Sequence, residues 1–309
     1  MIGSNSTRSL VADMVPELKN PLRGREETRL FLSLKADGAL SEEGMVDTTL
    51  AVKGLQDMAL ARGAEKVYLL ATSATRDAKN RQAFERLLLQ ETGLTLGLLS
   101  GEEEARLAFL GASGLLPEGE KGVLDIGGGS TEVVVGREGI DTAISLQMGA
   151  GRLMKMQRVD GLEDIPRART LADKVVKTLP LLKANHWAMV GGTGTTLMHM
   201  LLQVPQGSEV PEIFPVRKED AESMLRLTAG LPREKRGNIP GLPPQRADIM
   251  PTGLVILLSV MEHLGLKNIH ITTRNNTDGF LLNLLTQPKD GIPKGRSPFG
   301  GAWGKAPSP

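Results

Sequence analysis

The chain carries one short phrase twice, and this repeat constrains its fold more than any other feature. Residues 2–14 read IGSNSTRSLVADM and residues 126–138 read IGGGSTEVVVGRE, so Ile, Gly, Ser and Thr recur at a constant offset of 124. Each copy has the pattern of a strand, a tight polar turn and a returning strand. We therefore expect two related units whose turns face each other across a central cleft.

The polar turn of each copy suits a bound anion. Glycine permits positive φ and close approach of the backbone, so consecutive N–H groups can converge on one negatively charged group. An ordinary hairpin turn explains either copy alone equally well, whereas two matched copies favour a pair of phosphate-binding loops. The candidate phosphate-binding residues are Gly3, Ser4, Asn5 and Ser6 in the first turn and Gly127, Gly128, Gly129 and Ser130 in the second.

The length and patterning of the chain indicate two α/β domains. With 309 residues and 40% hydrophobic content, the chain is long enough for two cores. Strands alternate with helices in both halves, which predicts mixed sheets covered by helices, with ligands at the strand ends. We expect domain I over residues 1–116, domain II over residues 117–287, and a disordered tail rich in Pro and Gly over residues 288–309. An apolar helix is predicted over residues 251–265, with Pro251 in its first turn.

Composition excludes several classes of function. Lys and Arg number 37 against 36 Asp and Glu, and only 3% of residues are aromatic, so neither charge nor base stacking points to nucleic acid. The absence of cysteine excludes disulfides, thiolate catalysis and Cys-ligated metals. No apolar stretch reaches the roughly 18 residues of a membrane span, so we expect a cytoplasmic protein without a membrane partner. The oligomeric state stays open, with a homodimer among the outcomes.

Three acidic residues are candidates for catalysis or metal binding. Asp125 ends an apolar strand before the second turn and Glu132 begins the returning strand, so both are candidate ligands of Mg²⁺, which prefers oxygen. Alternatively, Asp125 bonds turn amides and Glu132 is solvated. Glu103 follows Ser100 by three residues, which is the spacing of a helix capping box. The competing interpretation makes Glu103 a general base that takes a proton from water.

Two further segments are candidates for holding phosphate. Arg76 follows the loop ATSAT, where an Arg beside clustered hydroxyls fits bidentate phosphate recognition, although a surface Arg explains the pattern equally well. The sequence GGTGTT at residues 191–196 is the equivalent loop of the second half. Gly192 and Thr193 of that loop are its candidate phosphate-binding residues.

Six motifs taken together resemble one known family. The segments GSNSTR, ATSATRDAKN, LSGEEEARLAFLG, LDIGGGSTE, GGTGTT and RADIMPTG match, in order and spacing, the exopolyphosphatase and guanosine pentaphosphate phosphohydrolase (Ppx/GppA) family. The resemblance implies duplicated ribonuclease H-like domains of the actin, sugar kinase and Hsp70 superfamily, with mixed sheets facing a central cleft. It also implies Mg²⁺-dependent hydrolysis of the terminal phosphoanhydride of inorganic polyphosphate or of guanosine pentaphosphate (pppGpp).

The resemblance assigns roles to individual residues. Glu103 looks like the family's catalytic Glu, with neighbouring Glu104 leaving the register open by one position. Arg76 looks like a phosphate-binding Arg, and Asp125 and Glu132 look like the acidic pair of the second phosphate loop. The chain ends before the helical region that larger members add, so it resembles the short two-domain form.

Two departures from the family pattern keep rival functions open. Met1 stands where the family has an Asp at the end of a strand, and residues 271–279 include TTRNNTDG in place of the family's pattern near the C-terminus. Either change weakens the electrostatic grip on metal and phosphate. The alternatives are an actin-like ATPase or sugar kinase, and a weakly active sensor that binds phosphate or an alarmone.

Overall fold

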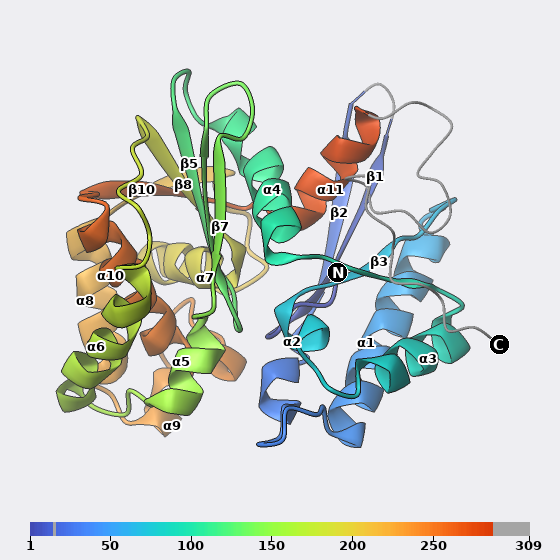
Figure 1. Ribbon diagram of the computed structural model, residues 1–309, viewed down its shortest axis with the longest axis horizontal. Helices are drawn as coiled ribbons and strands as arrows, with labels where there is room; N and C mark the ends of the chain where they lie inside the picture. The colour runs from blue at the N-terminus through green and yellow to red at the C-terminus, as the bar shows by residue number, and fades with distance from the viewer. Residues whose placement is uncertain (15–16, 287–309) are drawn as a thin grey trace.

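The chain folds into two lobes with two helices, α4 and α11, between them (Figure 1). The computed structural model describes residues 1–14 and 17–286, so the tail predicted at residues 288–309 lies outside the described residues. Within the described ranges, none of the helices combines the length and apolarity needed to cross a membrane.

The second lobe is built on one six-stranded sheet in the order β7-β6-β5-β8-β10-β9. β5 pairs antiparallel with β6 and parallel with β8, so the sheet is mixed, as the sequence predicts. Buried valines make β5 and β6 good strand formers. The turn between these two strands is the second copy of the repeated phrase. The strands are β5 (Lys121–Ile126), β6 (Thr131–Gly136), β7 (Thr142–Leu146), β8 (His186–Val190), β9 (Ile213–Arg217) and β10 (Asn268–Thr272).

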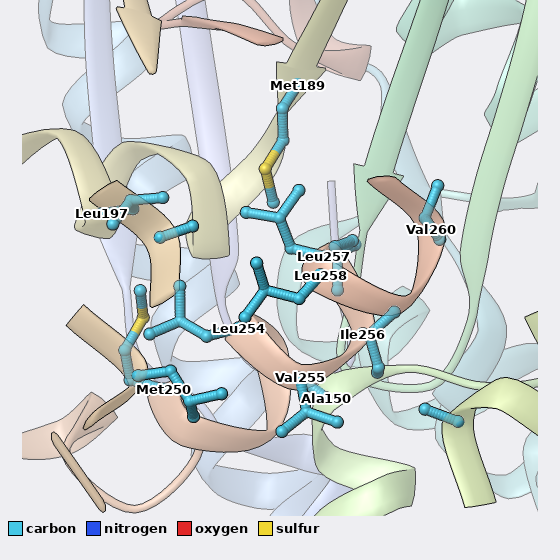
Figure 2. Packing of buried hydrophobic residues seen from close by; sticks show 14 of the residues in the cluster. Ala150, Met189, Leu197, Met250, Leu254, Val255, Ile256, Leu257, Leu258 and Val260 are labelled. Carbon is cyan, nitrogen blue, oxygen red and sulfur yellow. The ribbon is translucent and has the colours of Figure 1, made fainter. Parts of the chain in front are cut away.

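An almost wholly apolar helix supports this sheet. The helix α10 (Met250–His263) has Pro251 in its first turn, where a missing N–H costs no hydrogen bond, and its residues are buried as far as Met261. Figure 2 shows its Leu254 and Leu257 in the same cluster as Met189 of β8. The predicted helix at residues 251–265 is therefore confirmed. The other helices of this lobe are α5 (Ala150–Met156), α6 (Ile165–Val176), α7 (Gly191–Leu202), α8 (Lys218–Ala229) and α9 (Arg233–Arg236).

The first lobe has smaller sheets. The hairpin β1–β2 and the parallel pair β3–β4 are joined through Ile2, which bridges to Thr7 on one side and to Ala71 on the other. Beyond Ile2, a cavity of about 1110 Å³ separates β1 from β3. The elements of this lobe are β1 (Thr7–Asp13), β2 (Lys19–Glu26), β3 (Leu69–Ala71), β4 (Leu96–Leu98), α1 (Glu42–Ala61), α2 (Ser73–Arg76) and α3 (Arg81–Thr92).

The two central helices, α4 (Gly101–Ala112) and α11 (Asn276–Leu285), cross at very short range. A Cβ on Gly279 would lie 1.8 Å from the carbonyl oxygen of Leu107, and one on Gly111 would lie 2.3 Å from that of Asn275. Only glycine allows the two backbones to approach this closely. The crossing fixes how the two lobes meet.

Helix α4, which lies before the expected domain boundary after residue 116, packs on the sheet of the second lobe. Its Ala105 and Ala108 contact Val123 and Val134 of that sheet. Small side chains give α4 a flat apolar face, and a flat face fits the surface of a sheet. The other central helix, α11, packs on the first lobe, where its Phe280 contacts residues of that lobe.

The helix crossing generates a stability prediction. We expect Gly279→Ala to lower the free energy of unfolding by about 1–3 kcal/mol or more, because the added methyl group forces the two helices apart. Thermal unfolding followed by circular dichroism would measure the change. Gly54→Ala is the matched control, since Gly54 is an exposed position of helix α1 with no heavy atom within 4 Å of the added Cβ, and it should stabilise by about 0.4–1 kcal/mol. Equal midpoints for the two variants would contradict the prediction.

Candidate active site

The two copies of the repeated phrase meet at one pocket between the lobes. The pocket has a volume of about 70 Å³ and is lined by both polar turns and by the start of α7. The candidate phosphate-binding residues at its wall are Gly3, Ser4, Asn5, Ser6, Gly127, Gly128, Ser130, Gly192 and Thr193. The structure therefore brings together the segments that the sequence singled out, and their binding of phosphate stays a prediction.

The two turns have the same backbone hydrogen bond. The amide of Gly3 donates to the carbonyl of Ser6 at 3.0 Å, and the amide of Gly127 donates to the carbonyl of Ser130 at 3.0 Å. A Cβ on Gly128 would lie 2.8 Å from the Cβ of Ser4, so the turns nearly touch. Gly129 is not at the pocket wall; it lies against Ser73 of α2, where a Cβ would be 2.5 Å from the hydroxyl oxygen.

Three buried carboxylates form a cluster, of which Glu104 and Asp125 line this pocket and Glu132 does not. Glu104, Asp125 and Glu132 each offer an oxygen within 4.8 Å of the others. Burial, followed by repulsion from Asp125, raises the pKa of Glu104 to about 8. Burial also raises the pKa of Asp125, and burial together with the two neighbouring carboxylates raises that of Glu132. One oxygen of Glu104 and one of Glu132 have no hydrogen-bond partner in the described part of the chain.

Glu103 does not belong to this cluster. Its carboxylate accepts a hydrogen bond of 2.8 Å from the amide of Ser100, while the Ser100 hydroxyl accepts one of 3.1 Å from the amide of Glu103. This reciprocal pair is the capping box that the spacing predicted as the alternative. The next residue lies about 100° further round the helix and enters the pocket. The structure therefore places Glu104, and not Glu103, in the carboxylate cluster, and which of the two is catalytic stays a prediction.

Arg76 lies next to the carboxylate cluster and does not line the pocket. Its guanidinium donates to the carbonyl of Leu99 at 2.7 Å and lies 3.7 Å from a carboxylate oxygen of Glu104. Its positive charge counteracts part of the rise in the pKa of Glu104. The structure therefore places Arg76 where it contacts the acidic cluster.

Two arginines at the pocket wall were missed by the sequence reasoning. Arg8 and Arg246 both line the pocket, and Arg246 is buried. Burial, followed by repulsion from Arg25, lowers the pKa of Arg8 to about 10 and that of Arg246 to about 9. The sequence did contain a signal for both residues, because Arg8 is the last residue of the motif GSNSTR and Arg246 is the first residue of RADIMPTG.

The two departures from the family pattern also lie at the pocket. Met1 is at its wall, together with Asn275 and Asn276 from the segment TTRNNTDG. The side chain of Asn276 hydrogen-bonds Asp125, which partly offsets the rise in the pKa of that carboxyl. An amide at this position therefore interacts with the acidic cluster without adding charge to it.

The fold and the pocket define a class of protein. Two lobes with a mixed sheet, and duplicated glycine-rich hairpins between them, are the architecture of the actin, sugar kinase and Hsp70 superfamily. Within that class, the sequence profile of the Ppx/GppA phosphatase family matches residues 11–287, and the chain belongs to this family. The resemblance and the fold class drawn from the sequence are thus confirmed.

Similar proteins match over most of their length. The chain is 29% identical to exopolyphosphatase 2 of Mycobacterium tuberculosis (strain CDC 1551 / Oshkosh), covering 91% of this chain and 96% of that protein. The structure of the Aquifex aeolicus PPX-GPPA enzyme is similar with a TM-score of 0.75 at 27% identity, covering 91% and 96%. An exopolyphosphatase structure from Cytophaga hutchinsonii ATCC 33406 shares the fold, with a TM-score of 0.84 at 22% identity and coverage of 94% and 97%.

The buried carboxylates generate a prediction on stability against pH. An unfolded Glu104 titrates near 4.5 and the folded one near 8, so its stabilising contribution is complete below pH 4.5 and is lost as pH rises through 8. In buffer without divalent cations, we expect Glu104→Gln to raise the thermal midpoint at pH 8.5 by at least about 2 °C over wild type. The gain should shrink toward pH 5. A variant no more stable than wild type at pH 8.5 would show that this burial cost is absent.

Proposed function

We propose that this chain hydrolyses the terminal phosphoanhydride of inorganic polyphosphate, with Glu104 as the general base. The observation that carries the proposal is the pairing, in one pocket, of two phosphate-loop turns with a buried carboxylate cluster. Membership of a phosphatase family supports it, as does the similarity to a relative named exopolyphosphatase 2. Guanosine pentaphosphate ends in the same kind of bond and is the second substrate to test.

The terminal phosphoryl group would lie between the two turns. Backbone amides of the glycine-rich turns converge on its oxygens, and the hydroxyls of Ser4 and Ser130 lie at the same wall. Arg8 and Arg246 add positive charge from the side. A pocket of about 70 Å³ accommodates one end of a phosphate chain, which fits removal of a terminal unit. Phosphoryl transfer needs mainly such positioning and charge stabilisation.

The acidic cluster fits Mg²⁺. Its donors are all carboxylate oxygens, and those of Glu104 and Glu132 without hydrogen-bond partners are available as ligands. Asp125 and Glu132 would hold the ion, as the sequence predicts. When bound, Mg²⁺ supplies positive charge that offsets both the carboxylates and the phosphoryl oxygens.

In this proposal, Glu104 takes a proton from an attacking water. Arg76 at 3.7 Å favours the ionised carboxylate that this role requires. The water oxygen then forms a bond to the terminal phosphorus while the bridging P–O bond breaks. Inorganic phosphate and a chain shorter by one unit leave the pocket, and Glu104 returns its proton to solvent.

A pair of neighbouring variants tests the choice of base. We expect Glu104→Gln to lower kcat for phosphate release from polyphosphate by about 10²- to 10⁴-fold, because the water loses its proton acceptor. Glu103→Gln should stay within roughly threefold of wild type, since a glutamine also closes a capping box. Phosphate release in the presence of Mg²⁺, from polyphosphate and from pppGpp, is the measurement. Equal losses in the two variants would contradict the assignment, and binding without turnover by wild type would favour a sensor.

A second test concerns the metal ligands. We expect Asp125→Asn to raise the Mg²⁺ concentration for half-maximal activity by about tenfold or more, because a charged ligand is lost. Glu102→Gln is the control, since Glu102 is an exposed carboxylate on the same helix as Glu104 and pairs with Arg106. A chelator should abolish activity, and added Mg²⁺ should restore it. An unchanged Mg²⁺ dependence in Asp125→Asn would remove Asp125 from the proposed ligand set.

A further inference from the structure

We infer that Glu27 is an internal counter-ion that limits how tightly the arginine side of the pocket holds phosphate. This inference rests on the proposed function, because it concerns how the same pocket binds and releases its product. Glu27 follows strand β2 and is not at the pocket wall. However, Glu27 contacts residues that do line the pocket.

The contacts of Glu27 join one phosphate loop to two arginines. One carboxylate oxygen accepts a hydrogen bond of 2.5 Å from the side-chain amide of Asn5, which lies in the first turn. The other accepts one of 2.7 Å from Nε of Arg25 and lies 3.7 Å from Nη1 of Arg246. The Glu27 side chain is 18% exposed and that of Arg246 is 4% exposed, so these charges interact with little screening by water.

The arginines around Glu27 repel one another. Repulsion from Arg25 lowers the pKa of Arg8 and that of Arg246, whereas attraction to Glu27 raises both pKa values. Asp125 adds a second negative charge that acts on Arg8. Glu27 therefore supplies negative charge to this group of cations when no anion is bound.

A phosphate in the pocket would compete with Glu27 for the same cations. Nε of Arg246 has no hydrogen-bond partner within the described residues. Arg246 therefore keeps donor capacity for a phosphate while Glu27 reduces the net attraction. Weaker attraction favours release of inorganic phosphate, a step that each turnover must complete.

The test is equilibrium binding of inorganic phosphate by titration calorimetry, which needs no hydrolysis. We expect Glu27→Gln to lower Kd for phosphate on the order of tenfold, because removing one negative charge beside the arginines strengthens the attraction. Glu26→Gln is the matched control: it makes the same change in net charge at the exposed neighbouring residue, and its Kd should stay within about twofold of wild type. Glu27→Asp, which keeps the charge, should bind more like wild type than Glu27→Gln does.

Steady-state kinetics give a second readout that a purely structural role would not produce. Glu27→Gln should show stronger inhibition by product phosphate, with kcat and KM for polyphosphate both lowered. If Glu27→Gln is less stable than wild type, phosphate should still raise its thermal midpoint more than that of wild type. Unchanged or weaker phosphate binding in Glu27→Gln, or no phosphate binding in wild type, would overturn the inference. Wild type that binds phosphate but releases none from polyphosphate would instead count against the proposed function.

Discussion

The structure depends on keeping three carboxylates together away from water. Glu104, Asp125 and Glu132 lie within 4.8 Å of one another and are all buried, so both desolvation and mutual repulsion oppose their ionisation. Such a cluster lowers the free energy of unfolding, and natural proteins tolerate this cost mainly at functional sites. Two neighbouring side chains reduce this cost: Arg76 contacts Glu104, and Asn276 hydrogen-bonds Asp125.

The position of helix α4 makes this cluster possible. Asp125 and Glu132 stand opposite each other on β5 and β6, whereas Glu104 comes from a segment that precedes both strands. Because α4 packs its alanine face on the second sheet, its first turn is carried to the ends of those strands. The close crossing with α11 at Gly111 and Gly279 then holds α4 in place. The packing of α4 against the second sheet and α11 therefore sets the distance between the three carboxylates.

Much of this arrangement could be read from the sequence. The repeated phrase predicted two phosphate-loop hairpins, and alternation of strands and helices predicted the mixed sheet. The sequence could not decide whether Glu103 or Glu104 faces the pocket, because a run of three acidic residues is compatible with either. The packing of α4 on the second sheet is decided by tertiary contacts, which the local sequence pattern does not encode. Arg8 and Arg246 lay in quoted motifs, but lone arginines are common on surfaces.

Ion pairs add to the contacts made by the central helices. Arg23 of β2 makes a bidentate pair with Asp278 of α11, and Arg29 pairs with Asp248, which precedes α10. Both arginines are partly exposed, but the side chains of Asp278 and Asp248 are only 6% and 5% exposed, so loss of either arginine would leave a buried carboxylate without that partner. The glycine-mediated crossing of α4 and α11 is by contrast a rigid contact between backbones.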